Sequence, residues 1–321
     1  MTMHYVGVDL GATNLRAAVG DEHGTVNGSA RTQTPDGTQP RKTVSDAICD
    51  VVKDACQDAG VDPTTVAAAS VAAMGRLDFE TGTVSVSANF SGDVGPLHLR
   101  DPLCALLDTD TVYLSSDTLA GAIGEHEHAH PDVDNLVYLT ISSGIGAGVI
   151  ADGALVGWNG NAGEVGHTTI DHDGFMTCGC GHPGHWEAYC SGENIPRFAR
   201  ALHHRENIDT ELPLDADDEF TAKEVFKRAD SDPLADRVIE QVATLNTIGV
   251  ANLVHSYAPQ VVVIGGAVAL NNPALVVDPI RERLPDAVVT DVPNVTNSRL
   301  GEKAVLQGAL TVAINGGVDE H

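Results

Sequence analysis

Two glycine-rich turns in this sequence carry groups that can hold a phosphate. The first reads Asp9-Leu10-Gly11-Ala12-Thr13-Asn14 and lies between two apolar runs. Glycine lets the backbone approach a phosphate, amide N–H groups and the Thr13 hydroxyl can donate to it, and Asp9 can orient a hydrated Mg²⁺. Taken alone, this turn also fits an ordinary hairpin with glycine at positive φ.

The second turn, Ser142-Ser143-Gly144-Ile145-Gly146-Ala147-Gly148, offers two hydroxyls and three glycines. No lysine follows as in a Walker A loop, and strand-like sequence follows where a Rossmann motif has a helix. The pair of turns predicts a nucleotide whose phosphates lie between them. Further along, Gly265-Gly266-Ala267 fits either an adenosine lying on the backbone or a turn that caps a helix.

Cysteine and histidine gather in one short region. Cys178, Cys180 and Cys190 lie in a glycine- and histidine-rich stretch. An intracellular protein of this size is a poor candidate for a disulfide framework, so metal binding is the better interpretation. Thiolates and imidazoles together favour Zn²⁺.

The elements that position these groups occur twice along the chain. Hydrophobic periodicity and glycine turns predict a strand–turn–strand hairpin over 4–21 and another over 136–156. The remaining expected elements are a helix at 43–60, strands at 66–74 and 111–117, a helix from 118, a helix at 233–257, a strand and glycine turn at 260–269, and a helix at 301–315. The recurrence predicts a duplicated α/β unit forming two lobes with a cleft between them.

The charge balance excludes some classes of partner. The chain has 18 Lys and Arg against 45 Asp and Glu, a net charge of −27. Nucleic acid and anionic membranes need a basic surface, so neither is an expected partner. Acidic residues spread over the whole chain are typical of proteins from halophilic organisms. No secretory signal and no membrane-length apolar run is evident, so we expect a cytoplasmic protein.

The motifs as a set resemble the ROK family of actin-like sugar kinases and repressors. The resemblance extends over essentially the whole chain, through DLGATN (9–14), SDTLAGAIGE (116–125), the turn at 142–148, GNAGEVGH (160–167), CGCGHPGHWE (178–187), SGENI (191–195) and VIGGAV (263–268). It implies an α/β, actin-like ATPase (ribonuclease H-like) fold with two lobes and a central cleft. The small lobe would comprise 1–116 and 301–321, and the large lobe 117–300.

The resemblance also implies the reaction and its residues. Asp117 would be the general base that takes a proton from a hexose hydroxyl as ATP, with Mg²⁺, donates its γ-phosphoryl group. Read without this context, Asp117 fits a helix N-cap equally well. The implied sugar contacts are Asn89, Ser116, Asp117, Glu164, His167 and Glu187. The implied nucleotide contacts are Asp9, Gly11, Thr13, Asn14, Ser143, Gly144, Gly265 and Gly266.

The resemblance further implies a structural zinc site. ROK proteins place a cysteine where this sequence has His185, an exchange that zinc chemistry tolerates. The predicted ligands are His167, Cys178, Cys180 and His185, with His182 and Cys190 as competitors for the fourth position. A reduced thiol pair without metal is the alternative.

Two positions depart from the family pattern and limit the assignment. Ser116 replaces an asparagine that contacts the sugar, and Ser142-Ser143 replaces a Gly-Thr pair. The first choice is a glucokinase, which is an enzyme of carbohydrate metabolism and glycolysis. Fructokinase and N-acetylhexosamine kinase are the alternatives. A sugar-responsive repressor is disfavoured by the acidity and by the short segment before Asp9. A catalytically inactive sugar-binding or scaffold protein is disfavoured because Asp9, Thr13 and Asp117 are all present. A homodimer or homotetramer is the expected assembly.

Overall fold

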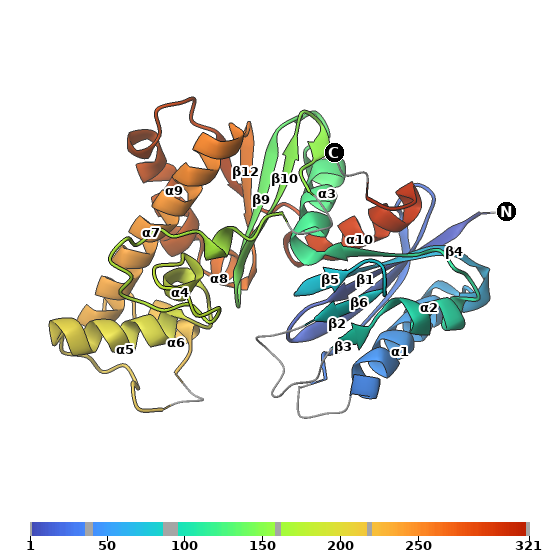
Figure 1. The fold of residues 1–321 in the computed structure, drawn as a ribbon, viewed down its shortest axis with the longest axis horizontal. Helices are drawn as coiled ribbons and strands as arrows, with labels where there is room; N and C mark the ends of the chain where they lie inside the picture. Colours follow the sequence, from blue (N-terminus) through green and yellow to red (C-terminus); the bar gives the residue numbers. More distant parts are fainter. Residues whose placement is uncertain (1, 36–40, 86–95, 158–161, 217–219, 319–321) are drawn as a thin grey trace. The chain divides into compact units, whose positions relative to one another are not determined.

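The chain forms two compact units and contains two five-stranded sheets (Figure 1). The computed structural model describes residues 2–35, 41–85, 96–157, 162–216 and 220–318. Unit 1 comprises Met1–Asp132, Ala154–Ala162 and Lys303–His321, and unit 2 comprises Val133–Gly153 and Gly163–Glu302.

The sheet of unit 1 has the strand order β3-β2-β1-β4-β8. Its strands are β1 (His4–Leu10), β2 (Asn14–Asp21), β3 (Val26–Gln33), β4 (Val66–Ala73) and β8 (Val112–Ser116). β1, β2 and β3 are antiparallel neighbours, whereas β1, β4 and β8 run parallel. β1 and β4 are apolar on both faces because helices cover both sides of the sheet. The carboxyl ends of β1, β4 and β8 therefore meet at one edge of the sheet.

Two of the helices of unit 1 pack closely against each other at glycine residues. The helices of unit 1 are α1 (Arg41–Ala59), α2 (Arg100–Leu107), α3 (Asp117–Ala129) and α10 (Ala304–Asn315). α10 packs on β1 and β4 and also against α3, next to which it lies in Figure 1. A Cβ at Gly308 would lie 1.7 Å from the Ala120 carbonyl oxygen, and one at Gly124 would lie 2.2 Å from that of Ala304. Glycine at both positions lets these two helices touch backbone to backbone.

The second five-stranded sheet has the order β11-β10-β9-β12-β13, which repeats the order of the first, and all of its strands except β11 belong to unit 2. Its strands are β9 (Leu136–Ile141), β10 (Ile145–Ala151), β11 (Ala154–Leu155), β12 (Val261–Gly265) and β13 (Asn294–Asn297). As in unit 1, a first antiparallel hairpin (β9–β10) is followed by parallel pairing of β9 with β12 and of β12 with β13. The duplication predicted from the glycine turns is thus present as a repeated topology.

Helices and short segments complete both units. Unit 2 contains α4 (Glu187–Cys190), α5 (Ile195–Glu206), α6 (Ala222–Lys227), α7 (Pro233–Tyr257), α8 (Ala267–Asn271) and α9 (Pro273–Ala287). The remaining elements are the strands β5 (Arg76–Asp78), β6 (Thr83–Ser85) and β7 (Leu97–His98), which form a small sheet, and the 3₁₀ turns η1 (Pro63–Thr65), η2 (Val165–His167) and η3 (Gly301–Lys303). Among the described residues, no helix is both long and apolar enough to cross a membrane.

The two units divide the chain at positions other than those of the predicted lobes. Residues 117–132 group with unit 1 because α3 packs on α10, and 154–162 also group with unit 1. The lobe boundaries at 116/117 and 300/301 stay a prediction.

Candidate active site and metal centre

A buried carboxylate lies near the carboxyl end of β1, the central strand of the first sheet. Asp9 is one residue from the end of β1, directly opposite Arg16 in the β1–β2 hairpin, and only 8% of it is exposed. The Arg16 guanidinium lies 3.6 Å from the Asp9 carboxylate. Burial raises the pKa of Asp9 to about 7; Arg16 opposes that shift, and the negative charge of Asp117 adds to it. The structure thus brings Asp9 and Asp117 together.

Asp117 begins α3 at the sheet edge where β8 ends, but it does not cap the helix. The N-cap is Ser116, whose hydroxyl accepts a hydrogen bond from the Leu119 N–H at 3.2 Å. Asp117 is the first helical residue, is half-buried, and accepts from the Thr118 N–H at 2.8 Å. The alternative interpretation of Asp117 as the N-cap is therefore wrong, because Ser116 takes that position.

The first glycine-rich turn is a tight link between β1 and β2. The Gly11 N–H donates to the Asn14 carbonyl at 3.0 Å, and Thr34 braces the turn by donating its hydroxyl to the Gly11 carbonyl at 2.7 Å. Thr13 is exposed and available to a ligand. Gly11 is not among the glycines at positive φ, so that part of the hairpin interpretation is wrong. The Asn14 side-chain oxygen accepts two hydrogen bonds from Arg31, which places the positive Arg31 guanidinium beside the turn.

In unit 2 the two other glycine turns are adjacent. The Ser142 hydroxyl accepts a hydrogen bond from the Ala267 N–H at 3.4 Å. Gly266 has φ +86°, and a Cβ there would lie 2.5 Å from the Ile141 carbonyl oxygen. Gly265 likewise leaves room for the Tyr138 ring. The predicted nucleotide residues Ser143, Gly144, Gly265 and Gly266 thus come from neighbouring turns, at the ends of the parallel strands β9 and β12.

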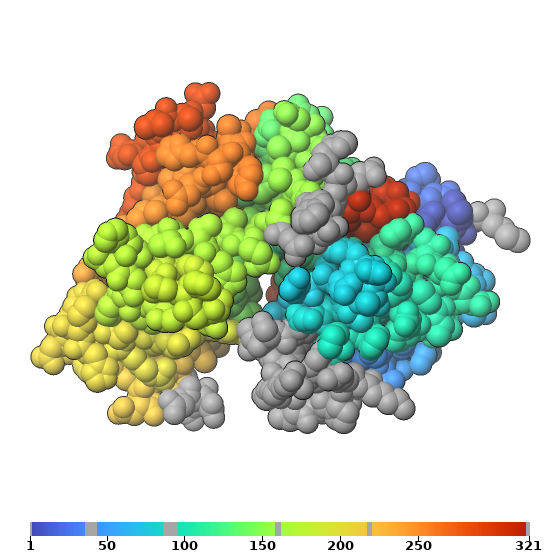
Figure 2. Space-filling model, viewed as in Figure 1, coloured from blue at the N-terminus to red at the C-terminus, as the bar shows by residue number. Residues whose placement is uncertain are grey.

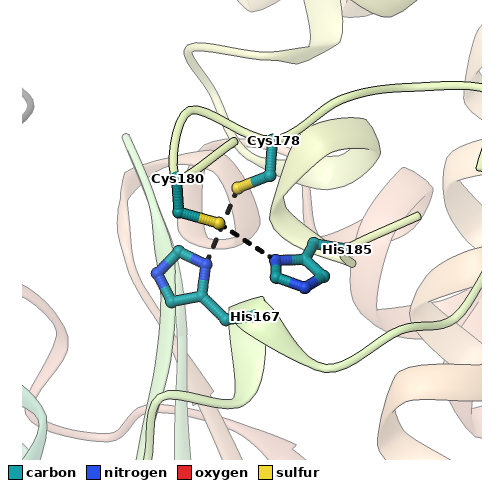
Figure 3. Close-up of side chains that lie close together, drawn as sticks. All are labelled: His167, Cys178, Cys180 and His185. Carbon is teal, nitrogen blue, oxygen red and sulfur yellow. Dashed lines mark hydrogen bonds between the residues drawn. The ribbon is translucent and has the colours of Figure 1, made fainter. Parts of the chain in front are cut away.

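The four predicted metal ligands form one cluster (Figure 3). Each of His167, Cys178, Cys180 and His185 offers one ligand atom, and these atoms all lie within 4.8 Å of one another. Cys178 Sγ is 3.6 Å from His167 Nδ1, and Cys180 Sγ is 3.2 Å from His185 Nδ1.

The competitors for the fourth position lie outside this group. His182 stacks on His185 with its Nδ1 3.7 Å from Cys180 Sγ, and Cys190 is fully buried with its thiol against the Val242 carbonyl. All six cysteines are free thiols in this structure.

A network of backbone hydrogen bonds shapes the loop that carries the ligands. The Cys178 N–H donates to the His182 carbonyl at 2.9 Å, and the Trp186 N–H donates to the Thr168 carbonyl at 3.0 Å. The Trp186 ring is buried and donates to Asn246 of α7 at 2.8 Å. Figure 2 shows the yellow-green stretch that contains this loop at the surface of unit 2. The loop is therefore exposed on one side and anchored to α7 on the other.

The two thiols of the cluster have different affinities for protons. Burial raises the pKa of Cys178 to about 11. Burial also raises the pKa of Cys180, but hydrogen bonds from His182 and from Cys178 outweigh it and lower that pKa to about 7. Binding of a metal would release the Cys178 proton, since a thiolate is the ligand.

The two implied sugar carboxylates near the cluster differ in their contacts. Glu164 is exposed and lies 3.8 Å from His167 Nε2, the ring nitrogen that points away from Cys178. Glu187 is half-buried and accepts a hydrogen bond from the Ile145 N–H at 2.9 Å. Asn89, another implied sugar contact, lies outside the described residues.

A family model matches residues 5–315 of this chain, and its description is the ROK family. The chain belongs to the ROK family. A glucokinase from Pyrobaculum calidifontis is 32% identical over 311 residues, covering 96% of this chain and 94% of that protein. Two solved structures are similar to this ROK protein over nearly all of both chains. They are a ROK hexokinase from Thermus thermophilus (31% identity, TM-score 0.79, 97% of this chain and 98% of that one) and a ROK glucokinase from Streptomyces griseus in complex with glucose and AMPPNP (30%, 0.77, 98% and 100%).

The family membership and the actin-like fold predicted from the motifs are therefore confirmed. Contacts that the sequence analysis missed are Arg16 with Asp9, Glu187 with Ile145, and Ser142 with Ala267. The contact of Arg16 with Asp9 could have been predicted from the sequence, because a tight hairpin after Asp9 places Arg16 opposite it. The other two contacts join segments that are distant in sequence, and no sequence pattern indicated them.

Proposed function

We propose that this ROK protein is an ATP-dependent glucokinase that converts glucose and ATP to glucose 6-phosphate and ADP, with Asp117 as general base. The observation that carries the proposal is the pair Asp9 and Asp117 at the carboxyl edge of parallel strands, with the capping task left to Ser116. Ligands of open α/β sheets bind at such an edge. The similar proteins named glucokinase add support.

The proposed chemistry needs little more than positioning and one proton acceptor. Phosphoryl transfer passes through a transition state that proteins stabilise mainly by orientation and charge. Asp117 takes the proton from the attacking hexose hydroxyl, which a half-buried carboxylate at a helix start can do. Thr13, Ser143 and the amides of the glycine turns donate to phosphate oxygens.

Asp9 fits the role of holding the water shell of Mg²⁺. A buried carboxylate with a pKa near 7 lacks sufficient neutralising charge, and a divalent cation supplies it. The ion, when bound to ATP, neutralises charge on the phosphates. Arg16 alone leaves the pKa raised, so Asp9 keeps the capacity to interact with a further cation.

The cluster of two thiols and two imidazoles fits a structural Zn²⁺. Four protein ligands leave no open position for substrate, and the donor set is one that zinc prefers. When bound, the ion supplies a rigid link between η2 and the segment before α4. His167 would bind it through one ring nitrogen and face the sugar and Glu164 with the other.

The identity of the hexose is the part of the proposal that most needs a direct test. Ser116 stands where the family has a sugar-contacting asparagine, and its hydroxyl caps α3. A coupled assay should compare glucose, fructose, mannose and N-acetylglucosamine, with ATP, ADP and polyphosphate as donors. We expect the highest kcat/KM for glucose with ATP; a higher value for fructose or an N-acetylhexosamine would replace the glucokinase assignment with the corresponding alternative.

A further inference from the structure

The contacts of Glu187 point to a role beyond holding the sugar. We propose that Glu187 is a positioning residue for the phosphate turn, defined as Ser142–Ile145, so that one carboxylate serves both the sugar and the nucleotide. The inference rests on the proposed kinase function and deepens it.

The phosphate turn is built around the Glu187 carboxylate. The Ile145 N–H donates to Glu187 Oε2 at 2.9 Å. A Cβ at Gly144 would lie 2.7 Å from the same oxygen, closer than real side chains come. Gly144 therefore does more than let a phosphate approach: it also makes room for the carboxylate that fixes the turn.

Glu187 itself has little freedom to move with the turn. It follows Trp186, whose buried ring donates to Asn246 and contacts Gly249 of α7. Its second oxygen, Oε1, lies 4.0 Å from Cys178 Sγ. The carboxylate thus joins the phosphate turn to the loop that carries the metal ligands.

The chain after Glu187 holds the same turn through its backbone. The Gly192 N–H donates to the Ser142 carbonyl at 2.7 Å, and the Glu193 N–H donates to the Ser143 carbonyl at 3.3 Å. These bonds keep the turn beside the segment that bears Glu187 and would survive any substitution of its side chain. The carboxylate adds a side-chain hydrogen bond at the end of the turn where β10 begins.

A shared carboxylate predicts coupling between the two substrates. If a sugar hydroxyl donates to Glu187, the carboxylate is held in place and the turn is ordered before the nucleotide binds. Coupling of this kind is reciprocal, so the nucleotide must strengthen sugar binding by the same factor.

The test is isothermal titration of ADP and, separately, of glucose into the zinc-loaded full-length protein. Glu187→Ala should weaken ADP binding in the absence of sugar by about tenfold, because it removes a hydrogen bond to a charged acceptor. Glu187→Gln keeps an oxygen acceptor for the Ile145 N–H and should retain ADP affinity within about threefold. The matched control is Glu164→Ala, which removes the other implied sugar carboxylate. Among the described residues this carboxylate lies beside His167 and makes no hydrogen bond to the phosphate turn, so the variant should weaken glucose binding only.

A second variant approaches the contact from the turn. Gly144→Ala places a methyl group against Glu187 Oε2 and should weaken glucose binding without nucleotide by about tenfold. The inference is overturned if Glu187→Ala weakens glucose but leaves ADP affinity unchanged, or if Gly144→Ala leaves glucose affinity unchanged. If the unaltered protein binds neither ADP nor glucose, the proposed function itself fails, and this inference fails with it.

Discussion

Asp9 is a residue at which folding and the proposed catalysis make opposite demands. Its pKa is raised from 3.8 to about 7 by burial and by the charge of Asp117, so the folded chain holds a proton between these pH values that the unfolded chain releases. The unfolding free energy should therefore fall as the pH rises from about 4 to 7, and the full penalty should be present above 7. A bound cation would reduce this penalty.

Replacing the Asp9 carboxylate should remove this loss of unfolding free energy. Asp9→Asn should raise the free energy of unfolding in metal-free buffer at pH 8 by about 2–4 kcal/mol, with the gain shrinking as the pH falls toward 4. The same variant should lose most of its kinase activity. Urea denaturation at several pH values measures the first effect, and a gain independent of pH would contradict the account.

The limits of sequence reasoning at this scale are clear around Asp117. Ser116, Asp117 and Thr118 are all residues that cap helices, and only the backbone conformation decides which of them does so. Ser116 has extended φ and ψ of −70° and 154° and takes the cap, which leaves Asp117 inside the helix. The motif context could select Asp117 as the base, but the residue types alone could not.

At the scale of elements, periodicity predicted most of what positions the site. The helix expected at 233–257 is α7 with the same bounds, and the two expected hairpins and the strands at 66–74 and 111–117 are present. The small sheet β5–β7 was missed because strands of two or three residues have no readable period. The final helix expected from 301 begins as a 3₁₀ turn, with α10 starting at Ala304.

The loop between η2 and α4 shows where prediction needs the fold. His182 and His185 both lie near Cys180 in sequence, and only the loop's hydrogen bonds determine which one faces the thiols. Substituting each histidine in turn tests which of the two is a metal ligand. His185→Ala should lose the bound zinc and lower stability, because three ligands hold the ion more weakly and two thiols are left close together.

The matched control is His182→Ala, which removes an exposed ring that stacks on His185 without joining the cluster. It should retain about one zinc per chain, as counted by metal analysis of protein purified without chelator. Loss of zinc from His182→Ala and its retention in His185→Ala would reverse the assignment. Fully active protein without zinc would refute a supporting role for the metal.

At the scale of the whole molecule, the charge of −27 is the dominant property. Self-repulsion of this size destabilises the compact state, and salt screens it as the Debye length shortens from about 10 Å at 0.1 M to about 3 Å at 1 M. The halophilic origin and the dimer or tetramer stay predictions. Light scattering at high salt would determine the assembly.

Stability should consequently rise with salt. The midpoint of thermal unfolding should increase between 0.1 and about 1 M KCl, where screening changes most. The control for general salt effects is a surface variant in which several exposed Asp and Glu residues are changed to Asn and Gln. Its midpoint should depend less on KCl, and an equal dependence would show that screening of the acidic surface is not the cause.

The central claim is that Asp117 removes the proton from the hexose. The most direct test is the kcat of Asp117→Asn for ATP-dependent glucose phosphorylation, with glucose and ADP binding measured on the same preparation. Loss of a general base predicts a fall in kcat of about 10²–10⁴-fold while the variant still binds both ligands. A kcat within a few fold of the unaltered enzyme would show that another group takes the proton and would contradict the account.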